Sequence, residues 1–236
     1  MPDSRDVVID VRGVQKEYRG LRPLRLRHLE VREGESVALV GFDQAAAEVF
    51  VNLVTAATVP DAGEVRAFGQ LTTAIADADT WLRSLDRFGI VSERAVVLDG
   101  MTVRDNLTMP ISMALHDVSD AVRSAIETLA AEVGLSELEQ AVATLDPLAR
   151  LRLRLGRAVG PGPRVLLAEH PNASIPAGDV AAFAADYARI VSTRGLTSVV
   201  LTADASFATS IATRVLMLQP ATGELRPLSG WRRWLR

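Results

Sequence analysis

The stretch from Ser36 to Val54 constrains the fold of this chain more than any other. It reads SVALVGFDQAAAEVFVNLV: an apolar run, a glycine at position 41, a short polar segment and a second apolar run rich in alanine. A continuous apolar run is typical of a strand buried within a parallel sheet, and alanine and glutamate favour the helix that follows. We therefore predict a strand up to Gly41 and a helix from about Ala46 to Ala57.

This strand, turn and helix have the layout of a phosphate-binding loop, whose pattern is GxxxxGK[ST]. In that pattern backbone N–H groups hold the phosphates, the lysine neutralises their charge and the hydroxyl binds magnesium. Gly41 keeps the first position and Gln44 lies within the loop, but Ala46, Ala47 and Glu48 replace the second glycine, the lysine and the hydroxyl residue. The sequence allows either an impaired phosphate site or a unit retained for packing alone.

Further segments place this unit in an α/β domain. VVIDVRGV and LRLRHLEV alternate apolar and polar residues, which predicts two antiparallel, half-buried strands. FGIVSE, RVLLAEH, SVVLTA and RVLMLQP predict buried strands, and GDVAAFAADYARIVSTRG predicts a long helix. Between residues 95 and 160 the pattern predicts consecutive helices, including SDAVRSAIETLAAEVG and LARLRLRLGRAVG. We expect a parallel core sheet with a helical insertion.

Composition narrows the classes of partner. The net charge is −3 and the chain lacks a basic excess, so we expect no nucleic-acid partner. There are no cysteines, which excludes disulfides and thiolate metal sites. No apolar run is long enough to cross a bilayer. By default we therefore expect a soluble cytoplasmic protein; if a membrane is involved, another chain must supply the span.

Several segments follow one another in an order known from one protein family. VREGESVALVG, VPDAGEVRAFG, RFGIVSERAVVLDGMTVRDNLTMP, RVLLAEHPNAS and RVLMLQPATGEL resemble successive parts of the nucleotide-binding subunit of ABC transporters. The resemblance runs from about Val7 to Leu225. It implies an α/β, P-loop NTPase-like fold with a parallel core sheet, an antiparallel β subdomain and a helical subdomain.

The same resemblance implies a division of the chain. We expect a single ABC-type domain over 1–236, with the core and β subdomain at about 1–94 and 161–228. The helical subdomain falls at about 95–160. A basic and aromatic tail, which ends in WRRWLR, occupies 229–236.

The resemblance also assigns candidate catalytic and base-stacking positions. Glu169 falls at the Walker B aspartate, which orients hydrated magnesium, and His170 falls at the general base. A histidine could accept a proton near neutral pH. Tyr18 falls where the family stacks an aromatic ring on adenine. For all three residues, retention for packing is the alternative.

Other family positions have lost their chemistry. Ser92 and Glu93 stand at the glutamine loop, and an ionised glutamate only accepts hydrogen bonds. Ala203 stands at the switch histidine and offers no side-chain hydrogen bond. The loop at 174–177, SIPA, lacks the aspartate of the family's SALD-like loop.

The signature loop is changed throughout. The family has LSGGQ before a helix, and this chain has Leu145, Asp146, Pro147, Leu148 and Ala149. An aspartate would repel the γ-phosphate, and proline has no N–H to offer it. The same residues are a good helix start, with the aspartate as N-cap and the proline in the first turn.

Three carboxylates suggest one more site. If the fold is that of the family, Glu48, Glu93 and Glu169 all face the former phosphate site. Carboxylates in such a group could hold a divalent cation. Mutual repulsion in solvent is the alternative, and our assignment includes no metal ligand.

These observations lead to one main hypothesis and two rivals. The family's fold implies ATP and Mg²⁺, a second ABC subunit and a multi-span membrane permease, but the motifs argue against nucleotide binding. The main hypothesis is a degenerate ABC subunit with a structural or regulatory role in a membrane transport complex. The rivals are an active ATPase with unusual ligands, which would use Glu169 and His170, and a soluble scaffold without a permease.

Overall fold

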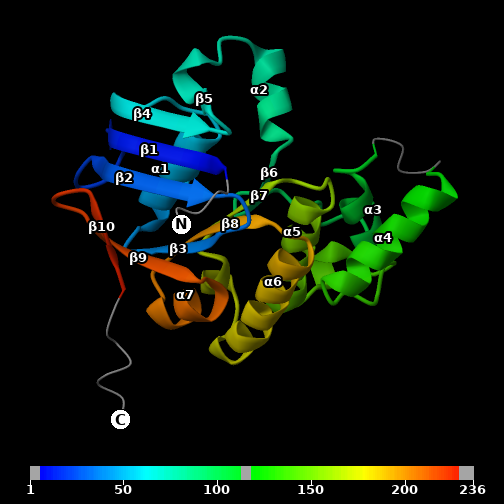
Figure 1. Ribbon diagram of the computed structural model, residues 1–236. Coiled ribbons are helices and arrows are strands. Elements are labelled where there is room, and N and C mark those ends of the chain that lie inside the picture. The colour runs from blue at the N-terminus through cyan, green and yellow to red at the C-terminus, as the bar shows by residue number, and fades with distance from the viewer. Residues whose placement is uncertain (1–5, 113–117, 229–236) are drawn as a thin grey trace.

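A computed structural model describes residues 6–112 and 118–228 of the chain. Its central feature is a six-stranded sheet in the order β10-β9-β3-β8-β7-β6 (Figure 1). All neighbouring pairs are parallel except β9 and β10, which form an antiparallel hairpin. The strands are β3 (Ser36–Val40), β6 (Phe88–Val91), β7 (Val165–Glu169), β8 (Thr197–Thr202), β9 (Arg214–Gln219) and β10 (Glu224–Pro227).

A second, antiparallel sheet has the order β2-β1-β4-β5. Its strands are β1 (Val7–Lys16), β2 (Leu24–Arg32), β4 (Ala62–Ala67) and β5 (Gln70–Leu71). Val11 lies opposite both Leu29 and Val65, so apolar residues of the three longer strands share one face. The predicted alternation of β1 and β2 and the predicted strands of the parallel sheet are confirmed.

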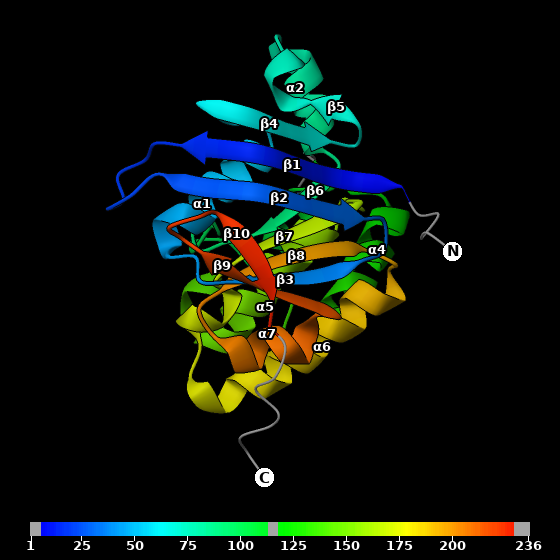
Figure 2. The ribbon, with the colours of Figure 1, turned by 60° about the vertical axis from the view of Figure 1, so that its left-hand side comes forward.

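Helix α1 (Gln44–Val54) lies between the two sheets, which Figure 2 shows as stacked layers. One hydrophobic core fills the space between the sheets. It contains side chains of α1, of the antiparallel sheet and of the face of the parallel sheet that is turned toward α1. Successive residues of a strand point to opposite faces, so Leu167 belongs to this core while Leu166 and Ala168 belong to the next. Helix α1 of the phosphate-loop-like unit therefore packs against a sheet on each side.

The remaining face of the parallel sheet is covered by helices, and a second hydrophobic core fills the space between them. These helices are α5 (Pro147–Val159), α6 (Val180–Thr193) and α7 (Ala205–Ile211). Helices α3 (Val103–Thr108) and α4 (Asp120–Glu132) pack against α5 to the side of the sheet (Figure 1). Helix α2 (Ala78–Leu85) lies apart from them, beside the antiparallel sheet (Figure 1). In the described part of 95–160 there is no strand, as predicted, apart from an isolated bridge between Thr102 and Ala141.

The bounds of α1 differ from the prediction of Ala46–Ala57. The helix begins earlier because Asp43 caps it and accepts a hydrogen bond from the Ala46 N–H at 2.7 Å. It ends earlier because Ala56 has a left-handed backbone, with φ of 59°. The loop that should hold phosphate is therefore shorter than expected.

Helices α2 and α7 were not predicted. Helix α2 has only eight residues and half-buries Trp81 and Leu85 on one face, which is a weak signal over so short a stretch. Helix α7 has only seven residues and is too short for a clear period. The sequence signal for the start of each helix was its N-cap aspartate, Asp77 for α2 and Asp204 for α7.

The contact between α5 and β6 depends on a glycine. A Cβ added at Gly89 would lie 2.3 Å from the carbonyl oxygen of Ala158 in α5. We expect Gly89→Ala to force the helix off the sheet and to lower the free energy of unfolding by about 1–3 kcal/mol. Gly100→Ala is the matched control, because a Cβ there meets nothing within 4 Å. Urea unfolding of both variants tests this, and equal stability would contradict the close packing.

None of the helices in the described residues is both long and apolar enough to span a membrane.

Candidate functional site

The candidate site lies where the parallel strands end. Gly41 follows β3, Ser92 follows β6, and Glu169 is the last residue of β7. Because the carboxyl ends of parallel strands meet at one edge of a sheet, these residues come together there with the start of α1. The fold therefore brings the phosphate-loop, glutamine-loop and Walker B positions to one place.

Gly41 makes the turn out of β3. Its φ of 93° favours glycine, and a Cβ there would lie 3.2 Å from the carbonyl oxygen of Leu218. The next residue, Phe42, is buried and packs edge-on against Phe50 of α1, with ring centroids 5.9 Å apart. The turn is thus fixed by core packing before any ligand is considered.

The N-terminus of α1 is capped in part by the chain itself. The Asp43 carboxylate accepts the Ala46 N–H, and the Asp43 carbonyl accepts the Ala47 N–H at 2.9 Å. Ala46 and Ala47 are buried, whereas Gln44 is exposed. The Ala46 N–H, one of the backbone donors that a helix N-terminus can offer to an anion, is therefore engaged by a residue of the same loop.

Arg94 links two of the carboxylates. Its guanidinium donates two hydrogen bonds to Glu169, from Nη2 to Oε1 at 2.5 Å and from Nε to Oε2 at 3.2 Å. Its third nitrogen, Nη1, donates to Glu48 at 3.2 Å. The Ser92 hydroxyl completes the group, because it donates to Glu169 Oε2 at 2.8 Å and accepts the Arg94 N–H.

The partners in this group of ion pairs differ in how far their side chains are exposed to solvent. The Glu169 side chain is 0% exposed, whereas those of Arg94 and Glu48 are each 41% exposed. The hydrogen bonds from Arg94 to Glu169 raise the pKa of the guanidinium, and they outweigh the opposing effect of its partial burial. Arg94 is therefore the fixed counter-charge of a buried carboxylate.

The three-carboxylate cation hypothesis is wrong. Glu48 and Glu169 are separated by the Arg94 guanidinium, and Glu93 is exposed, with its charge acting on Arg154. In residues 6–112 and 118–228 the acidic and histidine side chains that lie close enough to hold a metal are instead Asp10, His28 and Glu30. Two of those carboxylates already pair with arginines: Asp10 with Arg12, and Glu30 with Arg12 and Arg32.

His170 lies next to the ion pair in an unusual backbone conformation. Its φ and ψ are 44° and 47°, and its N–H donates to the Leu201 carbonyl. The residue is 8% exposed, and its Nε2 is buried without a hydrogen-bond partner among the described residues. The residue directly follows Glu169, the last residue of β7.

The signature-loop positions form a helix start, as predicted. Asp146 accepts the Ala149 N–H at 2.8 Å, and Pro147 is the first residue of α5. Leu145 and Leu148 are half-buried and pack against the second hydrophobic core. The Ala149 N–H points to a carboxylate of its own chain.

Two further sequence positions, Tyr18 and Ala203, lie around this edge. Tyr18 is half-buried, and both its burial and the nearby Asp43 charge raise the pKa of its hydroxyl. Its ring covers Gly20, where an added Cβ would meet it at 2.5 Å. Ala203 is exposed after β8, and the adjacent Thr202 donates its hydroxyl hydrogen bond to Asn172 at 3.0 Å.

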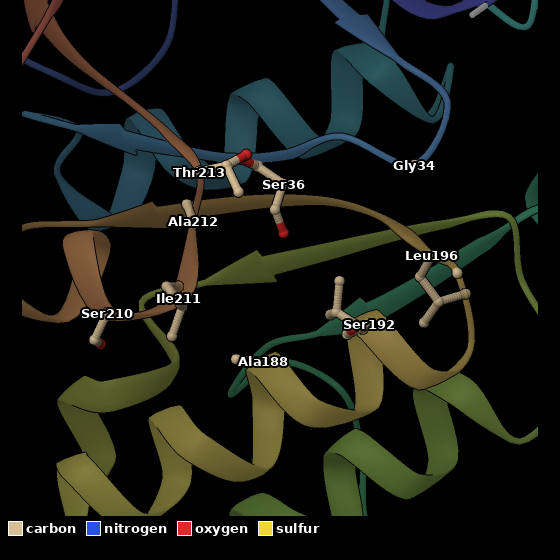
Figure 3. A pocket seen from close by; sticks show the side chains of 11 residues that line it. Gly34, Ser36, Ala188, Ser192, Leu196, Ser210, Ile211, Ala212 and Thr213 are labelled. Carbon is tan, nitrogen blue, oxygen red and sulfur yellow. The ribbon is translucent and has the colours of Figure 1, made fainter.

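A pocket of about 440 Å³ lies at the opposite edge of the sheet. Figure 3 shows Ser36 and Thr213 on one side of it, with Ala188 and Ser192 of α6 on the other. Its lining carries hydroxyl and apolar groups but no ionisable side chain. It is separate from the Arg94 ion pair, because Ser36 starts the strand that Gly41 follows.

Two side chains at the site were missed by sequence reasoning. Asp43 carried a recognisable signal, since an aspartate before a run of helix formers is a typical N-cap. Arg94 carried no such signal, because its partners Glu48 and Glu169 are 46 and 75 residues away in the chain.

Comparisons with known proteins place this geometry in context. No family model matches the chain. The macrolide export ATP-binding/permease protein MacB 1 of Aeromonas hydrophila is 27% identical over 177 residues, covering 72% of this chain and 27% of that protein. The methionine import ATP-binding protein MetN 2 of Pseudomonas aeruginosa is 27% identical over 176 residues, covering 74% and 51%. The Fe(3+) ions import ATP-binding protein FbpC of Serratia marcescens is 23% identical over 212 residues, covering 89% and 60%.

Solved structures match over nearly the whole chain. The ATP-binding cassette MJ0796, in a dimeric post-hydrolysis state bound to ADP and Pi, superposes with a TM-score of 0.77 at 19% identity, covering 94% of this chain and 100% of that one. CbiO1 from Clostridium perfringens, part of an ABC transporter complex, gives a TM-score of 0.77 at 14% identity, covering 93% and 87%.

These matches confirm the predicted fold, and they limit what else follows. The fold is that of ABC nucleotide-binding domains, with a mostly parallel sheet, an antiparallel sheet and helices. The chain spans about a quarter to a half of the length of MacB 1 and MetN 2. The activity of those whole proteins does not transfer with the fold.

Proposed function

We propose that this chain, which has the fold of ABC nucleotide-binding domains and sequence relatives among ABC transporter ATP-binding proteins, is a structural or regulatory subunit of a membrane transport complex. In this proposal it binds ATP weakly or not at all. One observation carries the proposal: the guanidinium of Arg94 lies between Glu48 and Glu169, the positions that match the magnesium ligands of the family.

The charge at the site supports weak nucleotide binding. The fully buried Glu169 carboxylate is already paired with the Arg94 guanidinium. A metal ion would have to displace this guanidinium in order to bind the carboxylate. Ala47 brings no charge where the pattern has lysine. A lysine about 4 Å from a phosphate charge contributes roughly 4 kcal/mol at an effective dielectric constant of about 20. The residues present therefore do not fit Mg-ATP, and we derive no hydrolytic step.

The helix N-terminus offers little in return. Its attraction for an anion is only about 0.3–1 kcal/mol at an exposed site. Here the Asp43 carboxylate already accepts the Ala46 N–H, so a phosphate would meet a negative charge at the start of α1. Tyr18 could add a stacking contribution of about 1–3 kcal/mol, by analogy with base–aromatic stacking. This gain is smaller than the combined losses.

A second subunit would not restore the site. In the family each nucleotide lies between the phosphate loop of one subunit and the signature loop of the other. Asp146 presents a carboxylate at the start of α5, and its neighbour Pro147 has no N–H. The proposed partners are still a second ABC subunit and a permease, but the role of the contact is assembly.

The segment that would meet a permease is well formed. Thr102 and Asp105 make a capping box at the start of α3. Asn106 is fully buried and ties this turn to the preceding loop through Leu98, whose N–H it accepts at 2.9 Å. The described residues include no membrane-spanning helix, so another chain would supply the span. We propose that the protein lies at the cytoplasmic face of a membrane and that 95–160 is its helical subdomain.

One observation favours the rival ATPase. The buried Nε2 of His170 has no hydrogen-bond partner among the described residues, which leaves it available for a polar contact with a ligand. Against this, the adjacent Glu169 is fully engaged by Arg94 and Ser92. Steady-state hydrolysis by the isolated wild type, lost in His170→Ala, would favour the rival.

We expect the protein to co-purify with an integral membrane protein. Met109→Asp, in the half-exposed turn after α3, should reduce this recovery at least fivefold, because it places a charge in an apolar contact. Leu21→Asp is the matched control, since Leu21 is fully exposed in the loop between β1 and β2. Quantitative mass spectrometry of pull-downs from native membranes measures both.

Two results would count against this proposal. If no integral membrane protein is recovered with the wild type, the scaffold without a permease is favoured. If Met109→Asp and Leu21→Asp bind equally well, the contact lies elsewhere on the molecule. The segment that we expect to meet the permease, residues 101–113, ends at Met113, which lies outside the described residues, as does the tail at 229–236.

A further inference from the structure

Two adjoining pockets lie at the edge of the parallel sheet opposite the Arg94 ion pair. One is the pocket of about 440 Å³ in Figure 3, and the other has a volume of about 340 Å³. Both are lined by Ala212 and Thr213, so they meet at the turn between α7 and β9. We call the two pockets together the edge groove.

The described residues end in the wall of this groove. Pro227 and Leu228 line the smaller pocket. Strand β10 runs antiparallel to β9, and the Leu228 N–H donates to the Val215 carbonyl at 2.9 Å. The backbone is therefore fixed at residue 228, and the tail at 229–236 continues from the groove itself.

The edge groove has a chemistry that suits tryptophan. Among its described lining residues the ionisable one is Arg214, which is already paired with Glu35 at 2.8 Å. Ser210 and Thr213 donate their hydroxyl hydrogens to backbone carbonyls at 2.7 and 3.1 Å, so their oxygens can still accept a hydrogen bond. An indole has a large apolar ring and a single N–H donor. The apolar side chains along the groove are Val191, Leu196, Ile211, Val215, Pro227 and Leu228.

The sequence of the tail, SGWRRWLR, matches this chemistry. Trp231, Trp234 and Leu235 follow the helical spacing i, i+3 and i+4, which places them on one face and the three arginines on the other. A segment this short does not form a stable helix in water by itself. Its apolar face therefore needs a surface to cover it.

We propose that the tail at 229–236 docks in the edge groove of its own chain, with Trp231 in the smaller pocket and Trp234 in the larger one. Trp231 is three residues beyond Leu228, or about 10 Å of extended chain, and the whole tail reaches at most about 29 Å. The arginines of the tail stay in water at the rim of the groove. This inference does not depend on the proposed function.

The tether favours the chain's own tail over a separate partner. A segment joined to its site by a short linker has an effective concentration of about millimolar or above. The linker here is the two residues between Leu228 and Trp231, so a weak apolar contact is enough to keep the groove occupied.

Tryptophan fluorescence of the full chain tests this proposal. The chain has three tryptophans, so in a Trp81→Phe background the emission comes from Trp231 and Trp234. We expect acrylamide to quench this emission about threefold less efficiently than that of the free peptide SGWRRWLR, because docked rings leave water. Ser192→Lys places bulk and a like charge in the larger pocket and should raise quenching toward the value of the peptide. Thr193→Lys is the matched control, because this next residue is also exposed but does not line the pocket.

The other outcomes contradict the proposal in distinguishable ways. Quenching as efficient as in the peptide overturns docking, and protection that survives Ser192→Lys overturns the groove as its place. Protection that grows with protein concentration assigns the tail to a second copy of the chain. Protection that appears only with phosphatidylglycerol vesicles assigns it to a membrane surface. Either of these last two results overturns docking within the chain, and circular dichroism confirms that each variant is folded.

Discussion

Replacing Arg94 with alanine should lower the free energy of unfolding by roughly 2–3 kcal/mol. The change leaves the Glu169 carboxylate, whose side chain is 0% exposed, with the Ser92 hydroxyl as its remaining bonded partner. Removing one partner of a buried ion pair costs about 3–5 kcal/mol, because the other charge stays buried and unpaired. Arg94 is itself 41% exposed, so water can enter its place and the expected loss is smaller.

Urea unfolding with matched variants measures this effect. The double variant Arg94→Ala, Glu169→Gln removes the buried charge, so it should recover about half or more of the lost stability. Arg123→Ala, on the exposed face of α4, should stay within about 0.5 kcal/mol of the wild type. An Arg94→Ala variant as stable as the wild type would mean that Glu169 is not held by this ion pair.

Much of the fold could be predicted because its signals are local. The apolar run before Gly41 and the alternating residues of β1 and β2 reflect burial on one or both faces of a strand. Short elements were missed because so few residues carry too weak a local signal. Helix α2 has only eight residues, and Asp43 moved the start of α1 by a single hydrogen bond.

The site could be predicted only in part. Glu48 and Glu169 each lie on an element that the local sequence pattern predicts. The resemblance to the family implies that these two elements meet at one edge of the sheet. The charge between them comes from Arg94, in a loop whose side-chain direction follows from the tertiary structure. The number of carboxylates at this edge therefore suggested a metal site. The cation that pairs with Glu48 and Glu169 is instead the guanidinium of Arg94.

The wild type should bind Mg-ATP with a Kd no better than about 1 mM, which corresponds to about −4 kcal/mol. Three features act together. Ala47 provides no lysine charge, Asp43 holds the Ala46 N–H, and Arg94 occupies the space between Glu48 and Glu169. The first alone forfeits roughly 4 kcal/mol of charge pairing, or about a thousandfold in affinity.

Partial repair of the loop should recover part of this affinity. The double variant Ala47→Lys, Glu48→Ser restores a cation and a hydroxyl and frees Arg94 from Glu48. Because Ala47 is fully buried, its folding has to be confirmed first. Any Mg-ATP affinity gained by a folded double variant over the wild type would locate the defect in the first turns of α1.

The most direct test of the central claim is an isothermal titration of the folded wild-type protein with Mg-ATP, extended to several millimolar nucleotide. The claim is that an internal ion pair has replaced the cation and nucleotide contacts at this edge of the sheet. It predicts no saturable binding below about 1 mM. Saturable binding with a micromolar Kd would contradict the claim and favour an active ATPase with unusual ligands.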